Sequence, residues 1–364
     1  MGLYQSVVRP LLFRLDAERA HHLALAAASI AAPFAGTLRR LLAVDDPRLA
    51  IDVAGLHFPN PLGLAAGFDK SGTGIATLAA LGFGAVEIGS VSIDASRGNP
   101  LPRLFRLPDD RAIVVHYGLP NDGIPAIAAR LQQTRLAVPL GINIVKTNRG
   151  RGAAPETPDQ IIAEYTEGAR LMAPQADYLM LNLSCPNTED GRDFFADAGT
   201  LRDCLAALAE RDLARPVFLK VSPLGGIATI ERVLAAAEPH AFIRGFMFNL
   251  PPVKPDGLVT PPAVWRDWPG AVSGRPAATL ADASIRAMYH RMDRRRHVII
   301  GAGGVFSAED AYAKIRMGCS LVQLLTALIY EGPFVVQDIL AGLARLLERD
   351  GFAHVADAVG ADIA

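Results

Sequence analysis

Amide side chains stand at the ends of short apolar runs along this sequence. Asn182 and Asn249 each end such a run, Asn143 lies near the end of another, and Asn187 follows Asn182 after a short turn. A buried amide without a hydrogen-bond partner costs about 1 to 3 kcal/mol, so each of the four needs a partner. A structural cap or turn would satisfy each one alone, whereas four amides at one rim favour a planar heterocyclic ligand with both donors and acceptors.

Two lysines occupy comparable positions. Lys70 follows Gly67-Phe68-Asp69, and Lys220 lies near the end of an apolar run. Lysine is rarely buried without an anion. Each lysine therefore predicts either a structural ion pair or a contact with an anionic group of a ligand.

Glycines and a cysteine complete the set of candidate site residues. Gly303-Gly304 and Thr326 follow two consecutive apolar runs near the C-terminus, where backbone N–H groups free of side chains would hold a phosphate, or else form a tight turn. Cys185 lies between Ser184 and a proline. As a thiol it would serve as a general base, a nucleophile or an inert buried group, and the absence of a histidine from its motif argues against acyl transfer.

Composition narrows the class of protein. The 364 residues are 51% hydrophobic and 20% charged, and 36 basic against 37 acidic residues give a net charge of -1. A chain of this composition can bury a large hydrophobic core. Its nearly neutral net charge produces no positive electrostatic potential that would attract nucleic acid. Its three cysteines, Cys185, Cys204 and Cys319, are widely spaced, so we predict neither a disulfide framework nor a metal site. No apolar run approaches the roughly 18 residues of a membrane span, and no signal peptide is evident.

The elements that would position these residues follow a βα pattern. Eight short apolar runs alternate with helical stretches, which predicts an α/β fold, a (β/α)₈ barrel of the TIM type with catalytic groups at the C-terminal ends of its strands. The expected strands are residues 61–66, 85–89, 139–144, 178–183, 217–221, 245–249, 297–301 and 321–325. The insertion at 96–122 is too long for a simple connection, so we expect a flap near the active-site rim.

The first 40 residues precede this pattern. Leucine- and alanine-rich stretches broken by Pro33 predict two short apolar helices, with Arg9, Arg14 and Arg19 interspersed. Helices of this kind either lie on a bilayer surface or pack as an arm on the core.

Motifs along nearly the whole chain resemble those of the dihydroorotate dehydrogenases, specifically the membrane-associated, quinone-dependent class. The matching segments are residues 15–21, 60–70, 102–107, 141–144, 182–188, 273–276 and 318–323. The resemblance implies a barrel at 41–364 that binds FMN, and an N-terminal helical extension at 1–40 that forms a quinone tunnel. It also implies a peripheral protein on the cytoplasmic face of the inner membrane, acting in pyrimidine biosynthesis.

The resemblance also assigns roles to residues. By position, the FMN-binding residues would be Ala65, Ala66, Gly67, Ser90, Asn143, Lys220, Ser273, Gly274, Gly303, Gly304 and Thr326, and the substrate-binding residues Lys70, Asn182, Asn187 and Asn249. Cys185 falls at the catalytic base, which takes a proton from dihydroorotate while hydride leaves for the flavin. One lysine would meet the substrate carboxylate and the other the reduced, anionic flavin.

The sequence departs from the family pattern at several points. Quinone-dependent members have serine at the base position, and Cys185 is typical of the soluble class. The family flap reads Asn-Arg-x-Gly-Phe-Asn, and here its first asparagine is Val115. Phe248 and Leu250 replace hydroxyl residues beside Asn249, with two prolines following, and Leu325 replaces a tyrosine. Because lost hydrogen bonds discriminate strongly between substrates, these changes bear on the substrate and on the electron acceptor.

The sequence is therefore compatible with three functions. The first is dihydroorotate oxidation with reoxidation by a quinone. The second is a paralogue with the same flavin chemistry on another small cyclic substrate, and the third is a barrel without catalytic function. The intact lysines and the Gly303-Gly304 pair argue against the third.

Overall fold

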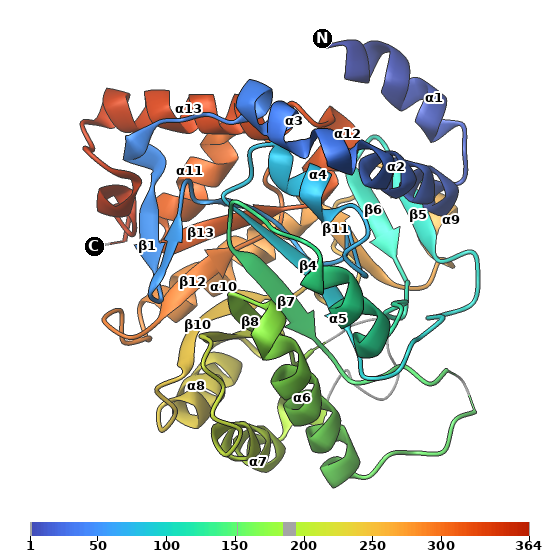
Figure 1. The fold of residues 1–364 in the computed structure, drawn as a ribbon, viewed down its shortest axis with the longest axis vertical. Helices are drawn as coiled ribbons and strands as arrows, with labels where there is room; N and C mark the ends of the chain where they lie inside the picture. Colours follow the sequence, from blue (N-terminus) through green and yellow to red (C-terminus); the bar gives the residue numbers. More distant parts are fainter. Residues whose placement is uncertain (1, 151, 185–193, 364) are drawn as a thin grey trace.

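The computed structural model describes residues 2–150, 152–184 and 194–363. Eight parallel strands close into a barrel in the order β10-β12-β13-β3-β4-β7-β8-β9 (Figure 1). They are β3 (Leu62–Leu64), β4 (Ala85–Val91), β7 (Leu140–Ile144), β8 (Tyr178–Asn182), β9 (Val217–Val221), β10 (Ile243–Phe248), β12 (Val298–Gly301) and β13 (Cys319–Leu324). Each predicted run overlaps one of these strands, which confirms the fold class, and the ends differ by at most a few residues.

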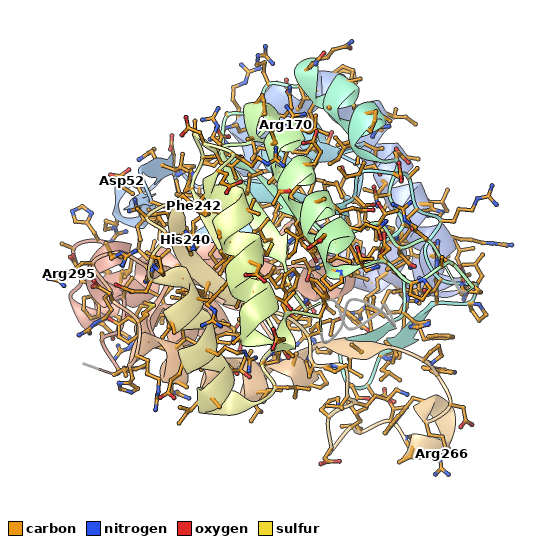
Figure 2. The ribbon with its side chains drawn as sticks, turned by 90° about the horizontal axis from the view of Figure 1, so that it is seen from below. Asp52, Arg170, His240, Phe242, Arg266 and Arg295 are labelled. Atoms are coloured by element: carbon orange, nitrogen blue, oxygen red, sulfur yellow. The ribbon has the colours of Figure 1, made fainter. Side chains whose placement is uncertain are left out.

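Helices surround the barrel and cover the outer faces of its strands (Figure 1). They are α4 (Ile75–Ala80), α5 (Ile124–Gln132), α6 (Pro158–Met172), α7 (Ala198–Ala209), α8 (Gly226–Ala237), α10 (Ala278–Tyr289), α11 (Ala308–Arg316) and α13 (Val335–Asp350). Every residue of β4, β7, β8 and β13 is buried, as expected for strands covered on both faces. Charged side chains such as those of Arg266 and Arg295 point outward at opposite edges of the molecule (Figure 2).

A small antiparallel sheet stands at the C-terminal rim of the barrel. It joins β5 (Leu104–Leu107) and β6 (Ala112–Val115), which lie within the predicted flap, to β11 (Ala271–Gly274) from the connection between β10 and β12. The short helix α9 (Pro262–Trp265) belongs to that same connection. Trp268 stacks on Phe105 of β5 with ring centroids 4.6 Å apart, so the two insertions pack as one unit. A separate hairpin, β1 (Ile51–Val53) and β2 (Leu56–Phe58), precedes the barrel.

The N-terminal segment contains more helix than the sequence predicts. A π-helical turn (Tyr4–Val8) leads into α1 (Arg9–Phe13), α2 (Ala17–Ala31) and α3 (Ala35–Leu42), where two helices were expected. Asp16 caps α2, because its side chain accepts from the backbone N–H groups of Glu18 and Arg19. The helix α1 projects away from the barrel (Figure 1). None of the described helices has the length and apolar character needed to cross a bilayer.

Candidate active site

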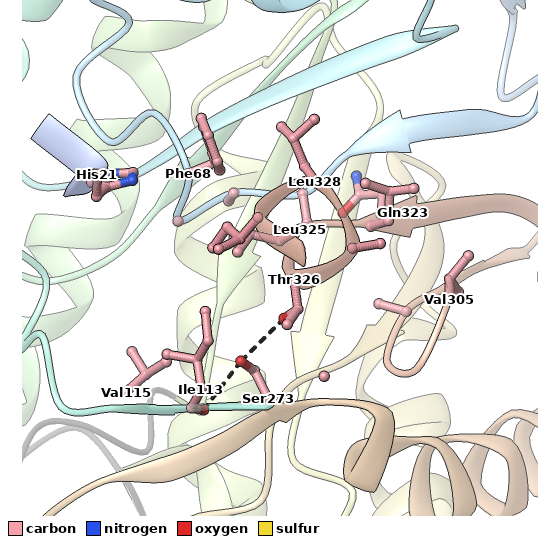
Figure 3. A pocket seen from close by; sticks show the side chains of 18 of the residues that line it. His21, Phe68, Ile113, Val115, Ser273, Val305, Gln323, Leu325, Thr326 and Leu328 are labelled. Carbon is pink, nitrogen blue, oxygen red and sulfur yellow. Dashed lines mark hydrogen bonds between the residues drawn. The ribbon is translucent and has the colours of Figure 1, made fainter. Parts of the chain in front are cut away.

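A cavity of about 710 Å³ extends from the C-terminal rim of the barrel to the N-terminal helices. Its walls come from α1, α2, the ends of the barrel strands, the rim sheet and the residues after β13. Figure 3 shows His21 and Phe68 on one side of the cavity and Ile113, Val115 and Ser273 on another. The helix α12 (Thr326–Glu331) starts at this wall, where Thr326 Oγ1 donates to Ser273 Oγ at 3.2 Å.

Most of the predicted site residues line this cavity. They are Ala65, Ala66, Gly67, Lys70, Ser90, Asn182, Lys220, Asn249, Ser273, Gly274, Gly303, Gly304 and Thr326. Asn143 is fully buried one layer behind them, where its Oδ1 accepts from Ser90 Oγ. Cys185 and Asn187 lie outside the described residues.

Behind Ser90, a hydrogen-bonded network runs into the barrel interior. Asn143 Nδ2 donates to Glu87 Oε1 at 2.8 Å, and Gln323 Nε2 and Tyr178 Oη donate to Glu87 Oε2 at 2.9 and 3.2 Å. Glu87 is 0% exposed. Burial, reinforced by the Glu87 carboxylate, raises the pKa of Tyr178 well above its usual value, so its hydroxyl stays a donor. The network fixes the Ser90 hydroxyl at the cavity wall.

A second set of amides joins the same network at the rim. Asn182 Nδ2 donates to Ser90 Oγ at 3.0 Å, and Asn182 Oδ1 accepts from Asn249 Nδ2 at 2.9 Å. Asn249 Nδ2 also donates to the carbonyl of Ser184 at 2.9 Å, while its Oδ1 accepts from the N–H of Leu250. The structure thus brings the predicted amides of β8 and β10 together, and they hold the residue that precedes Cys185.

Lys70 presents its ammonium group to the cavity. Its Nζ donates to the carbonyl of Gly67 at 2.8 Å and lies 3.8 Å from the centre of the Tyr117 ring. Burial lowers the pKa of Lys70 to about 8, and the carboxylates of Glu18 and Asp69 partly oppose that shift. The ammonium form is therefore sensitive to the charges around it in the neutral range of pH.

The glycines after β12 provide a place for an anion. Gly303 and Gly304 have φ angles of 90° and 77°, a region that favours glycine, and a Cβ on Gly304 would come within 2.5 Å of Ala278 Cβ. In the part of the chain that the structure describes, neither N–H donates to a protein acceptor. Donors held in this way, with no side chain in front of them, fit a phosphate group.

Comparison with known proteins identifies the family to which this fold belongs. A model of the dihydroorotate dehydrogenase family matches residues 48–347. The dihydroorotate dehydrogenase (quinone) of Natronomonas pharaonis is 41% identical over 368 residues, covering 100% of both chains, and that of Mycolicibacterium smegmatis is 40% identical over 361 residues, covering 98% and 99%. The chain belongs to the dihydroorotate dehydrogenase family. It is therefore an oxidoreductase, as its resemblance implied.

A solved dihydroorotate dehydrogenase shares the architecture of this chain. The crystal structure of the Eimeria tenella enzyme in complex with ferulenol superposes with a TM-score of 0.83 at 28% identity, covering 95% of this chain and 96% of that one. A ligand-free structure of the enzyme from the same organism gives a TM-score of 0.79, also at 28% identity.

The residues that depart from the dihydroorotate dehydrogenase pattern reach the cavity. Val115, Phe248, Leu250 and Leu325 all line it, and each presents an apolar side chain to it. At the other end, Arg106 donates to the carbonyl of Leu15 at 2.8 Å and lies 4.6 Å from the centre of the Phe13 ring. Arg106 thereby holds the turn between α1 and α2 over the cavity.

Sequence reasoning missed four residues around the site. Glu87 was the one acidic residue within an apolar strand, and that signal would have found it. Tyr117 sits in the flap motif, but only the fold shows that its ring lies against Lys70. Glu18 and Arg103 are 85 residues apart in sequence, and no local pattern links them.

Proposed function

We propose that this protein oxidises dihydroorotate to orotate, with FMN as cofactor and a quinone as electron acceptor. The observation that carries the proposal is the continuous cavity that joins the polar rim of the barrel to the apolar N-terminal helices in a chain of this family. Such a cavity has room for a cofactor at the rim and for an apolar acceptor beside α1 and α2. The reaction converts a CH–CH bond of the substrate to a double bond.

The residues of the rim fit FMN. Gly303 and Gly304 would bind its phosphate. Ser90, Lys220 and Thr326 line the same cavity, and the remaining cofactor contacts are those predicted above. Asn143 would act through Ser90, which accounts for its position behind the wall. When bound, FMN supplies a two-electron acceptor that a quinone reoxidises.

The substrate would lie between Lys70 and the amides of the rim. The Lys70 ammonium pairs with the substrate carboxylate, and Asn182, Asn187 and Asn249 orient the ring. Cys185 takes the proton from the substrate carbon, as its position in the family motif implies. A thiol has a reference pKa near 8.5, so it ionises far more readily than the serine of other quinone-dependent members.

The N-terminal segment, residues 1–40, would dock on the membrane and guide the quinone, with the barrel at 41–364 carrying the flavin. Exposed apolar side chains support this assignment: Leu3, Leu11, Leu23, Ile30 and Phe34 are 54 to 77% exposed. We place the protein on the cytoplasmic face of the inner membrane as a peripheral protein.

The test is anaerobic mixing of the purified flavoprotein with dihydroorotate, followed at the flavin band near ~450 nm. We expect rapid bleaching in the wild type and a rate at least about 100-fold lower in Cys185→Ala, because general-base catalysis is worth about 10² to 10⁴. A protein that holds FMN but stays oxidised would refute dihydroorotate as substrate. A protein that takes up no FMN would favour the barrel without catalytic function.

A second candidate is a paralogue that acts on a less polar cyclic substrate with the same flavin chemistry. The apolar side chains of Val115, Phe248 and Leu250 in the cavity favour it, because they cannot hydrogen-bond to the ureide of dihydroorotate. Bleaching by a carboxylated ring that lacks the ureide, without bleaching by dihydroorotate, would select this candidate.

A further inference from the structure

A buried ion pair joins the N-terminal helices to the flap. Glu18 of α2 and Arg103, just before β5, have side chains only 8% and 11% exposed. Arg103 Nη2 donates to Glu18 Oε1 at 2.7 Å, and Arg103 Nε lies 3.1 Å from both carboxylate oxygens. A bidentate pair of this kind fixes geometry as well as charge.

The guanidinium group of Arg103 also contacts three backbone carbonyl groups of the flap. Arg103 Nη1 donates to the carbonyl of Asn99 at 2.9 Å and to that of Tyr117 at 3.4 Å, and it also contacts the carbonyl of Arg97. Because these donors share one planar group, the Glu18 contact determines where the carbonyl of Tyr117 lies.

The side chain of Tyr117 connects this part of the flap to Lys70. Its ring is 8% exposed and lies 3.8 Å from Lys70 Nζ, while the Arg103 guanidinium lies 5.5 Å from the same ring. The ring is thus held between two cations, one that faces the cavity and one that binds the N-terminal helices.

The charges that act on Lys70 come from α2, from the adjacent Asp69 and from the flap. Glu18 of α2 and the adjacent Asp69 stabilise the ammonium form, whereas Arg103 destabilises it. Burial, reinforced by the charge of Lys70, holds the pKa of His21 of α2 well below its usual value, so the imidazole is neutral. Without Glu18, the positive charge of Arg103 would no longer be neutralised by its ion-pair partner, and it would destabilise the ammonium form of Lys70 more strongly.

We propose that Glu18 and Arg103 are positioning residues of the substrate site. Through the ring of Tyr117 they hold Lys70 in place, and the Glu18 carboxylate keeps Lys70 in its charged form. The N-terminal helices then take part in binding the substrate carboxylate, in addition to their proposed contact with quinone and membrane. This inference rests on the proposed function, since it assumes a substrate carboxylate at Lys70.

The experiment measures orotate binding to the oxidised, full-length flavoprotein, from the change in flavin absorbance between about pH 6 and 9. In Glu18→Gln we expect the alkaline loss of binding to move about one pH unit lower, so that the dissociation constant rises about twofold at pH 7 and about tenfold at pH 9. The direction follows because Glu18 raises the pKa of Lys70, and binding needs the protonated amine.

The matched control is Glu331→Gln. Glu331 forms an ion pair with Arg111 and accepts from Gln5, so it also ties the N-terminal segment to the barrel, but it does not contact Tyr117 or Lys70. We expect orotate binding and its pH dependence to stay at wild-type values in this control. A purely structural role for the Glu18 pair would instead give both variants the same behaviour.

Wild-type binding and an unmoved alkaline limb in a folded, FMN-loaded Glu18→Gln variant would overturn the inference. If that variant does not fold, Arg103→Lys decides, because lysine keeps the charge but cannot bind Glu18 and the flap carbonyls together. An unchanged orotate dissociation constant in Arg103→Lys would overturn the inference as well. A wild-type protein that neither binds orotate nor is reduced by dihydroorotate would refute the proposed function instead.

Discussion

The two ends of the cavity are built in different ways. At the barrel end, Ser90 is held by Asn143 and Glu87, which lie on barrel strands and are buried. At the flap end, Lys70 is held by Tyr117, Arg103 and Glu18, which come from the insertion and from the N-terminal helices. The first set moves only if the barrel deforms, whereas the second depends on segments that pack against one another outside it. In the proposed function, cofactor binding is thereby tied to the fold, and the contact with the substrate carboxylate to the docking of the N-terminal helices.

The largest expected effect is at the barrel end, in Glu87→Leu. Leucine leaves Asn143, Gln323 and Tyr178 without their acceptor, so we expect the free energy of unfolding to fall by about 3 kcal/mol or more, with loss of bound FMN. Denaturant unfolding and the flavin content of the purified protein measure both effects. Glu87→Gln keeps one acceptor oxygen and should lose less, and normal flavin content in Glu87→Leu would contradict the role given to this network.

The barrel end was also the more predictable from sequence. The apolar runs located all eight barrel strands, and the polar residues at their ends were found on the cavity wall. The sequence did not predict which of these residues reach the cavity surface and which lie behind it. Asn143 points into the barrel, as its place in the strand requires, but only the structure shows that Ser90 lies between it and the cavity. The flap end escaped prediction because its contacts join residues far apart in sequence, such as Glu18 and Arg103.

The next effect concerns the outer surface of the N-terminal helices. Leu23, Ile30 and Phe34 are 54%, 77% and 66% exposed, and none of them lines the cavity. Replacing all three with serine should weaken binding to phosphatidylglycerol-containing vesicles about 100-fold, since partial burial of each side chain in the bilayer contributes about 1 kcal/mol. Vesicle cosedimentation measures this, with flavin content unchanged.

The control for that experiment uses apolar side chains elsewhere on the surface. Leu101, Val253 and Val259 are 71%, 54% and 72% exposed, and the corresponding triple serine variant should bind vesicles like the wild type. Equal losses in the two variants would show that the N-terminal helices are not the membrane contact.

At the flap, Val115→Asn places an amide on the apolar wall of the cavity. If the natural substrate is dihydroorotate, the added hydrogen bond should raise kcat/KM for it about tenfold, equivalent to about 1.4 kcal/mol. Steady-state kinetics with a quinone acceptor measure the change. Val115→Ala removes bulk without adding an amide, and an equal gain in that control, or no gain in either variant, would favour the less polar substrate.

The smallest effect is a pH dependence confined to the docking of the N-terminal helices. His21 lies against Phe68 with ring centroids 5.1 Å apart, and burial together with Lys70 holds its pKa well below 6.5. Protons therefore bind more readily when α2 is undocked. Docking should be at full strength above about pH 6.5 and weaken below it, by at most about 1.4 kcal/mol per pH unit. Relative to the intrinsic exchange rate of an unprotected amide at each pH, hydrogen exchange of α2 amides should accelerate in that range while that of barrel amides holds steady. His21→Leu should abolish the acceleration, and replacing the largely exposed neighbour His22 with leucine should leave it intact. An acceleration that persists in His21→Leu would show that another group titrates in this range. The docking of α2 would then not depend on the protonation of His21.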